Sequence, residues 1–278
     1  MEPTPQFGAV PVVAQGAGRH CPSCHAEVPA GFVFCGQCGS RLGATAEPAA
    51  VNQAQTIFAG GAAPMPAAPQ PLGHLVLMRP DGKEGARHPL THGENLVGRG
   101  QGPLFDGDAY LSPRHAVLIP SAHGLEVQDL GSLNGVFLKI TQEEELQHGD
   151  VFRVGQELLR FEVIQAPEPT DDGTEVMGSP NPGYWGRLVV LCSPEVETAA
   201  HPVRSPEVLL GRERGDVVFR DDGYVSASHA RVMAREGRVY LSDLGSSNGT
   251  FFRLRQQRMV PTGSYLLIGQ QLFKVEMR

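Results

Sequence analysis

The stretch DLGSSNG at residues 243–249 occurs once earlier in the chain, almost unchanged, as DLGSLNG at residues 129–135. Three further short matches surround it in the same order. They are Gly98-Arg99 with Gly211-Arg212, SPRHA at residues 112–116 with SASHA at residues 226–230, and Gly155-Gln156 with Gly269-Gln270. The offset is 113 residues at the first of these pairs and 114 at the other matches, which places one inserted residue in a loop. Self-similarity over this length indicates two copies of one domain.

Each copy has about 95 residues and consists of short apolar runs broken by Gly, Pro, Asp and Asn. The runs that predict β-strands lie at residues 75–77, 116–119, 158–163, 188–191 and 238–241. No convincing amphipathic helix is evident in either copy. The sequence therefore predicts an all-β protein with two β-sandwiches.

The composition of the 278-residue chain changes abruptly at several places. Residues 44–72 are mostly Ala, Pro, Gly and Gln, and residues 166–183 are rich in Pro, Gly and Asp. Segments of this kind cannot bury enough apolar surface to fold, so both are predicted to be flexible linkers, the second one acidic. The other predicted parts are a disordered N-terminus (1–17), a metal module (18–43), a first sandwich (73–165) and a second sandwich (184–278).

The formal net charge of −7 is unevenly distributed. The first sandwich has 8 basic and 13 acidic residues, net −5, and the second has 13 and 10, net +3. Since neither is strongly basic, we do not expect a general nucleic-acid binder. The basic second sandwich beside the acidic linker predicts a local attraction.

Several classes of protein are excluded by the sequence pattern. No apolar run approaches the roughly 18 residues of a membrane-spanning helix, and the N-terminus lacks a secretory signal pattern. We therefore expect a cytoplasmic protein with no membrane partner. Three lysines against 20 arginines are typical of a GC-rich, bacterial genome.

Four of the five cysteines form the pattern C-x2-C-x10-C-x2-C, at Cys21, Cys24, Cys35 and Cys38. Four thiolates at this spacing suit a tetrahedral Zn²⁺ site. A module of roughly 25 residues has little core, so metal binding, on the order of 10–16 kcal/mol, would hold it together. Two disulfides or an iron–sulfur site are the alternatives. The pattern resembles the zinc-ribbon family over residues 18–43, which implies a closed, structural Zn²⁺ site.

Three residues near or outside this pattern are not expected to bind metal. His20 and His25 are interpreted as bystanders beside the cysteine cluster. Cys192 stands alone in the second copy, and we predict that it is a buried apolar residue.

The repeated polar residues suit a phosphorylated peptide. An arginine offers a fork of donors that matches a phosphate, a serine hydroxyl adds another donor, and an asparagine can bond a peptide backbone. Each also has a structural interpretation. Asn-Gly is typical of a type I′ hairpin turn, and Ser-x-x-His is typical of a local hydrogen-bonded corner. The phosphate interpretation depends on all of these residues recurring in the same order.

The order Gly-Arg, Ser-x-x-His, Asn-Gly resembles the forkhead-associated (FHA) domain family over residues 73–165 and 184–278. The resemblance implies an eleven-stranded β-sandwich whose apical loops bind phosphothreonine peptides, with peptide residues about three positions later adding specificity. The residues that it implies to contact the phosphate are Arg99, Ser112, Arg212 and Ser226. It further implies that Asn134 and Asn248 contact the peptide backbone, and that His115 and His229 stabilise the loops.

The two copies differ at a position where the family often supplies another polar contact. Ser247 precedes the asparagine in the second copy, whereas Leu133 precedes it in the first. The second copy also carries the net positive charge. We therefore expect the second copy to bind phosphate better.

An enzymatic function is not expected. The stretch GSSNG at residues 245–249 matches the nucleophile pattern G-x-S-x-G, but that site needs a following helix and a later histidine, and no histidine follows His229. No G-x-x-x-x-G-K-[ST] phosphate loop is present.

The predicted function is therefore a non-enzymatic, phosphothreonine-binding adaptor in Ser/Thr kinase signalling, with the zinc ribbon as a second interaction surface. The linker residues Thr56 and Thr174 are candidate phosphoacceptors that an FHA copy of the same or another molecule would capture. The alternative is a zinc-ribbon, nucleic-acid-associated regulator or scaffold, whose FHA copies mediate assembly without binding phosphate.

Overall fold

The computed structural model describes residues 19–21, 27–28 and 70–278, and the chain divides into two compact units, Met1–Met65 and Pro66–Arg278. In the smaller unit, β1 (Arg19–His20) pairs antiparallel with β2 (Glu27–Val28). Cys21 directly follows β1 and is buried. Cys24, Cys35, Cys38, His25 and Thr56 lie outside the described residues, so the predicted zinc ribbon stays a prediction.

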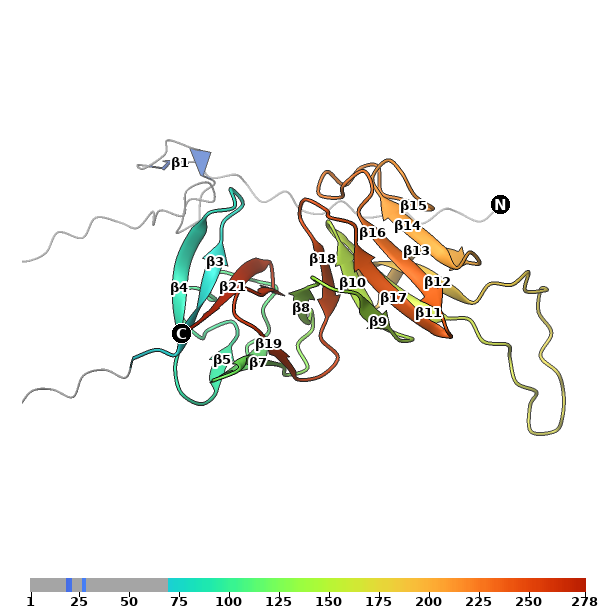
Figure 1. The fold of residues 1–278 in the computed structure, drawn as a ribbon, viewed down its shortest axis with the longest axis horizontal. Helices are drawn as coiled ribbons and strands as arrows, with labels where there is room; N and C mark the ends of the chain where they lie inside the picture. Colours follow the sequence, from blue (N-terminus) through green and yellow to red (C-terminus); the bar gives the residue numbers. More distant parts are fainter. Residues whose placement is uncertain (1–18, 22–26, 29–69) are drawn as a thin grey trace, which may run out of the picture. The chain divides into compact units, whose positions relative to one another are not determined.

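The described part of the larger unit contains strands and no helix (Figure 1). The first repeat supplies β3 (Gly73–Met78), β4 (Glu84–Leu90), β5 (Asn95–Val97), β6 (Ala116–Ser121), β7 (Gly124–Asp129), β8 (Val136–Lys139), β9 (Glu144–Leu146), β10 (Val151–Val154) and β11 (Glu157–Val163). The second repeat supplies β12 (Gly186–Ser193), β13 (Val196–Val203), β14 (Glu207–Gly211), β15 (Val217–Val218), β16 (Ala230–Arg235), β17 (Arg238–Asp243), β18 (Thr250–Arg253), β19 (Arg258–Val260), β20 (Tyr265–Ile268) and β21 (Gln271–Met277). The all-β prediction and the five strands predicted from apolar runs are confirmed.

The last three strands of each repeat complete the sandwich of the other repeat. β9 pairs with β17, β10 with β18 and β11 with β12, so these strands of the first repeat lie among those of the second. Reciprocally, β19 pairs with β7, β20 with β8 and β21 with β3. In Figure 1 the red strand β21 lies beside the cyan β3, and the green β9 lies beside the orange β17.

We call the two resulting sandwiches the first body (β3–β8 with β19–β21) and the second body (β12–β18 with β9–β11). They do not coincide with residues 73–165 and 184–278, which mark the two repeats along the sequence. Antiparallel pairing of β8 with β18 joins one sheet of each body into a continuous ten-stranded sheet. Each body thus takes strands from both halves of the chain.

The hydrophobic cores follow the exchanged arrangement. The first core packs Leu75, Leu118 and Leu138 of the first repeat against Leu266 and Phe273 of the second. The second core packs buried side chains of the second repeat against residues from β9–β11: Leu146, Phe152, Val154, Leu159 and Phe161. At about 1.5–3 kcal/mol for each fully buried large apolar side chain, the exchanged strands contribute a substantial part of the stability of both bodies.

Charge pairs connect the repeats around the exchanged strands. Four acidic residues of the first repeat pair with four arginines of the second: Arg235–Glu143 at 2.7 Å, Arg238–Glu145 at 3.3 Å, Arg255–Asp150 at 2.5 Å and Arg258–Glu144 at 2.6 Å. The acidic strand β9 thus lies on the basic second repeat. These pairs account for the opposite net charges of the repeats, and they involve the β9 region rather than the acidic linker.

Self-contained sandwiches would lose part of this complementarity. Glu145 of β9 lies opposite Tyr240 of β17, and the first-repeat counterpart of Tyr240, 114 residues earlier, is Glu126. In a self-contained first sandwich, Glu145 would therefore face Glu126, and like charges directly opposite on neighbouring strands are destabilising. The counterpart of Arg238 is Gly124, so the partner of Glu145 would be lost as well.

The structure corrects the prediction for Cys192, which is exposed. The preceding Leu191 is buried, and the pairing of β12 with β13 shifts register between Leu191 and Ser193. Cys192 therefore lies at a β-bulge, and its side chain faces solvent. The alternation that buries the preceding residues of β12 ends at this bulge.

Candidate functional site

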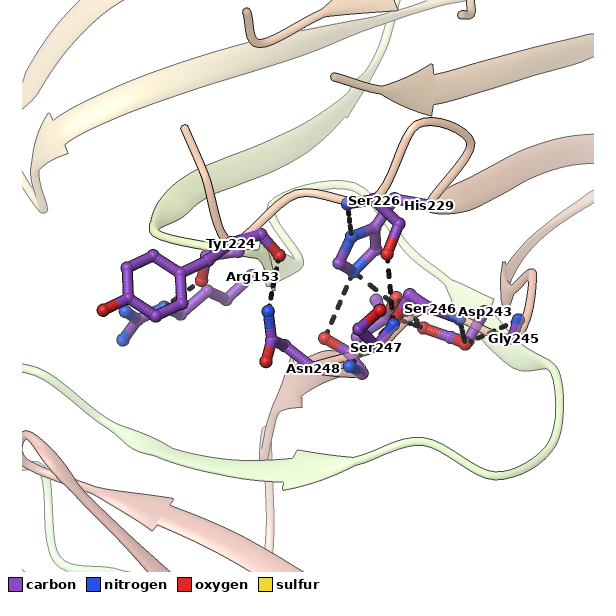
Figure 2. A network of polar contacts seen from close by, with 12 residues as sticks. Arg153, Tyr224, Ser226, His229, Asp243, Gly245, Ser246, Ser247 and Asn248 are labelled. Atoms are coloured by element: carbon purple, nitrogen blue, oxygen red, sulfur yellow. Dashed lines mark hydrogen bonds and ion pairs between the residues drawn. The ribbon is translucent and has the colours of Figure 1, made fainter. Parts of the chain in front are cut away.

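A buried histidine organises the loops at the end of the second body. The backbone N–H of Ser226 donates to Nδ1 of His229 at 3.0 Å, so Nε2 carries the proton and donates to the carbonyl oxygen of Gly249 at 3.2 Å (Figure 2). Burial lowers the pKa of His229, although the Gly249 carbonyl and Asp243 oppose this shift. The neutral ring thus ties the Ser226 loop to the Asn-Gly turn, which supports the structural role predicted for this histidine.

The first body has the same arrangement. The N–H of Ser112 donates to Nδ1 of His115 at 3.1 Å, and Nε2 of His115 donates to the carbonyl oxygen of Gly135 at 3.0 Å. Both histidines have no exposed surface. Two independent copies with matched geometry show that Ser-x-x-His forms the hydrogen-bonded corner between these loops.

The predicted phosphate contacts lie next to each other in the second body. The N–H of Arg212 donates to the carbonyl oxygen of Ser226 at 2.9 Å, and the Ser226 hydroxyl accepts the N–H of Ser247 at 3.1 Å. The Arg212 side chain is 38% exposed and pairs with Glu213 at 3.1 Å. The backbones of Arg212 and Ser226 are therefore neighbours, and a phosphate bound by the guanidinium would compete with the exposed Glu213 carboxylate.

In the first body, Arg99 and Ser112 are placed in the same way. The N–H of Arg99 donates to the carbonyl oxygen of Ser112 at 3.0 Å, and the Ser112 hydroxyl accepts the N–H of Leu133 at 3.2 Å. The Leu133 side chain is 69% exposed where Ser247 lies in the second body. The two sites therefore share a backbone frame and differ in the side chain at its rim.

Each asparagine fixes the loop that precedes the motif serine. Nδ2 of Asn248 donates to the carbonyl oxygen of Tyr224 at 2.8 Å, and Nδ2 of Asn134 donates to that of Tyr110 at 2.8 Å. Figure 2 shows the side-chain oxygen of Asn248 pointing away from Tyr224. That oxygen is available to accept a hydrogen bond from a peptide N–H.

The type I′ turn predicted at Asn-Gly is wrong. Gly135 and Gly249 have φ of 81° and 87°, but Glu236 is the only non-glycine residue with positive φ in the described part of the chain, whereas a type I′ turn needs positive φ at both central residues. The strands on either side, β7 and β8 or β17 and β18, belong to different sheets. Asn-Gly therefore lies in a loop between two sheets, and the asparagine side chain stabilises this loop through its hydrogen bond to the tyrosine carbonyl oxygen.

An aspartate supports the Asn-Gly loop in each body. In the second, Asp243 accepts hydrogen bonds from the Ser246 hydroxyl and the Thr250 hydroxyl, both at 2.7 Å. Although burial opposes it, these hydrogen bonds hold the pKa of Asp243 below its usual value. In the first, Asp129 accepts the Ser132 hydroxyl at 2.7 Å, and Val136 replaces the threonine.

Both repeats build each site. In the second body, Asp222 accepts the N–H of Tyr224 at 2.8 Å and the N–H of Gln156 at 2.6 Å, so the Tyr224 loop is attached to a turn of the first repeat. A Cβ on Gly155 (φ 61°) would collide with Asp222, which explains the glycine of this turn.

The first body has the reciprocal connection. Asp108 accepts the N–H of Tyr110 at 2.9 Å and the N–H of Gln270, from the second repeat, at 2.8 Å. The repeated Gly-Gln pair found in the sequence therefore serves to attach each exchanged segment to the site loop of the other repeat.

Sequence reasoning missed the tyrosine and aspartate of these loops. Tyr110 and Tyr224 are 51% and 56% exposed beside the asparagines. Asp108 and Asp222, like the tyrosines, recur at the 114-residue offset, so the repeat itself held the signal. Of the predicted candidates, Thr174 lies apart from this frame in the linker, where its N–H donates to Asp172 at 3.0 Å.

Comparison with known proteins identifies the family of the repeated domain. The FHA-domain family model matches residues 95–155 and 208–269, and residues 17–43 match a domain of unknown function, DUF7577. The Oxoglutarate dehydrogenase inhibitor of Corynebacterium glutamicum is 30% identical over 132 residues, which cover 47% of this chain and 88% of that protein. The chain belongs to the FHA-domain family.

Two further proteins match over shorter stretches. FHA domain-containing protein FhaB of Mycobacterium tuberculosis is 29% identical over 98 residues, 34% of this chain. The chain spans 63% of the length of that relative. A solved structure, Mycobacterium tuberculosis EmbR in complex with low affinity phosphopeptide, matches with a TM-score of 0.18 and 24% identity over 28% of this chain and 22% of that one. Among the described residues of this FHA protein, no helix is long and apolar enough to cross a membrane.

Proposed function

We propose that this tandem FHA protein is a phosphothreonine-binding adaptor in Ser/Thr kinase signalling. The observation that carries the proposal is the duplicated surface on which an arginine, a serine hydroxyl and an asparagine adjoin around a buried histidine. Hydrogen bonds hold the loops that carry these three residues, so their backbone positions are set before a ligand arrives. Such preorganisation lowers the entropy cost of binding.

The chemistry of the surface favours a dianion attached to an extended peptide. Arg212 or Arg99 supplies a guanidinium and Ser226 or Ser112 a hydroxyl for the phosphate oxygens, while the asparagine bonds the peptide backbone. Hydrogen bonds to charged groups contribute about 1.5–3 kcal/mol each. Two of them distinguish a phosphorylated from an unphosphorylated peptide by roughly 100-fold or more.

The test is titration of the full chain with labelled phosphothreonine peptides, followed by fluorescence anisotropy. Arg212→Ala in an Arg99→Ala background should weaken binding roughly 10- to 100-fold relative to Arg99→Ala alone. Arg79→Ala, which removes the same charge from the β3–β4 turn, is the matched control and should leave affinity unchanged. Equal binding of the unphosphorylated peptide, or no loss in the Arg212 variant, would overturn the proposal.

The adaptor proposal includes a ligand within the chain. Thr174 and Thr170 lie in the exposed linker, where hydrogen bonds from both threonines lower the pKa of Asp172 to about 2. We propose Thr174 and Thr56 as kinase targets that an FHA site of the same or another chain captures. Mass spectrometry after treatment with Ser/Thr kinases tests this: unmodified linkers would eliminate the internal ligand.

We further propose that Cys21, Cys24, Cys35 and Cys38 hold a structural Zn²⁺. The spacing of the cysteines supports this, as does the buried position of Cys21 directly after β1. Metal analysis of the purified chain before and after Cys35→Ser with Cys38→Ser should show one bound zinc that disappears. If residues 66–278 alone still bind phosphopeptide, phosphate recognition does not require the cysteine module.

A further inference from the structure

We propose that the second site selects peptides with an acidic side chain near the phosphothreonine, and that Arg153 of the first repeat makes this selection across the strand exchange. The inference rests on the proposed function of the site. It concerns a side chain that the sequence motif of the second repeat does not contain. The matched position of the first site is filled by Leu267 of the second repeat.

Arg153 enters the second site from β10. It lies opposite Phe251 of β18, and its neighbour Val154 lies opposite Thr250, two residues after Asn248. Figure 2 shows the Arg153 side chain running beneath Tyr224, on the side of the site to which Asn248 extends. Strand pairing thus places Arg153 beside the strand that follows the Asn248 turn, and its guanidinium extends toward the Tyr224 side of the site.

The charge of Arg153 is only partly compensated within the protein. Its Nε donates to the carbonyl oxygen of Gly155 at 2.8 Å, which orients the guanidinium. In the described part of the chain, no carboxylate lies within ion-pair distance of it, and the neighbouring Asp222 accepts two backbone N–H groups. Burial lowers the pKa of Arg153, and Asp222 opposes that shift. A half-buried guanidinium with unoccupied terminal donors suits a carboxylate, which binds arginine through two parallel hydrogen bonds.

A second cation from the first repeat adjoins the same turn. A Cβ on Gly249 would collide with the Lys139 side chain, so Lys139 lies directly against the Asn248-Gly249 turn. Lys139 also lies over the Tyr265 ring, 5.6 Å from its centroid. The second site therefore has cations on both flanks of its asparagine turn, both contributed by the first repeat.

The first site lacks one of these cations. Its Asn134-Gly135 turn is flanked by Arg253, which donates to the carbonyl oxygen of Ser132 at 3.4 Å and corresponds to Lys139. The counterpart of Arg153 is Leu267, on β20. Because the frames are otherwise equivalent, the two sites should read the same phosphothreonine and differ in the flanking residue: acidic at the second site, neutral or apolar at the first.

The experiment measures the full chain with Arg99→Ala, so that only the second site binds. Labelled phosphothreonine peptides carry Asp or Asn at each flanking position in turn. At one position we expect Asp to bind roughly 10-fold more tightly than Asn. Arg153→Leu should remove that ratio, so that the Asp and Asn peptides bind equally, and Arg153→Lys should retain part of it.

The reciprocal variant is the matched control. In an Arg212→Ala background, Leu267→Arg should give the first site the acidic preference that it lacks. A merely structural role for Arg153 would change the affinity for both peptides equally. The inference is overturned if phosphopeptides bind the second site without an acidic preference, or if the preference survives Arg153→Leu. Failure of all phosphopeptides to bind would overturn the proposed function itself.

Discussion

At the scale of single residues, the histidine corner links pH to stability. His229 is neutral in the fold, with Nδ1 accepting the Ser226 N–H, and a proton on Nδ1 would oppose that donor. Because the pKa of His229 is lowered from its ordinary value of 6.5, the unfolded chain takes up this proton first as the pH falls. The stabilisation is therefore complete above pH 6.5 and is lost as the pH falls through the lower folded pKa.

Thermal unfolding between neutral and mildly acidic pH measures this effect. The midpoint of the wild type should fall on acidification, and His229→Gln, although less stable, should show a flatter dependence. His123→Gln removes an exposed histidine and should leave the profile of the wild type unchanged. Parallel profiles for the wild type and His229→Gln would contradict the linkage.

The rim of the two sites provides a second residue-scale prediction. Leu133 and Ser247 share a backbone position, because each donates its N–H to the motif serine hydroxyl, at 3.2 and 3.1 Å. In an Arg212→Ala background, Leu133→Ser should therefore tighten phosphopeptide binding to the first site by several-fold, the worth of about one neutral hydrogen bond. Ser247→Leu should weaken phosphopeptide binding to the second site equally. If neither variant changes the affinity, the side chain at this position does not cause a difference in affinity between the two sites.

Individual site residues were predictable because the repeat located them twice. The arginine, serine, histidine and asparagine positions all adjoin in the fold, and the difference noted between Leu133 and Ser247 corresponds to an exposed apolar side chain at the rim of the first site. The turn at Asn-Gly was mispredicted because the local pattern does not tell a hairpin from a loop between sheets. Cys192 was mispredicted because an apolar run does not reveal the bulge that ends its alternation.

At the scale of elements, sequence periodicity assigns the face of each strand but not its partner. β9–β11 and β19–β21 have the same apolar alternation, so each set fits either sandwich. Which sandwich each set of strands joins therefore depends on weaker interactions, such as ion pairs between the strands. Exposed ion pairs contribute about 0–1 kcal/mol each, so every pair between β9 and the second repeat favours the exchanged arrangement by a small amount. The sequence predicts opposite charges on the repeats but places the attraction at the acidic linker, whereas in the structure it lies at residues 143–145.

The Asp150–Arg255 pair tests the exchange at this scale. Asp150, 5% exposed, accepts two hydrogen bonds from Arg255, at 2.5 and 2.6 Å. In self-contained sandwiches Asp150 would instead lie near the counterpart of Arg255, which is Thr141. A double-mutant cycle with Asp150→Asn and Arg255→Met, measured by urea unfolding, should therefore give a coupling free energy of about 1–2 kcal/mol. This value is lower than that of a fully buried ion pair because the Arg255 side chain is a third exposed. Additive single effects would contradict the exchanged arrangement.

At the scale of the whole molecule, the exchange changes what the acidic linker connects. Val163 at the end of β11 lies opposite Gly186 at the start of β12, and the N–H of Ile164 donates to the carbonyl oxygen of Trp185 at 3.0 Å. Both ends of the linker therefore lie side by side in the second body. The linker closes a loop on one sandwich, and the connections between the bodies are the short segments after β8 and β18.

Cutting the linker distinguishes the two arrangements. With a specific protease site in place of residues around Thr174, the cleaved halves should stay together during size-exclusion chromatography, because each half contributes strands to both cores. They should separate only under conditions that unfold the protein, and high salt should not release them, since burial of apolar strands is not screened. Self-contained sandwiches would separate after cleavage on dilution or at high salt. A companion variant lacking residues 169–180 should fold with unchanged stability, because β11 and β12 are already neighbours in the sheet.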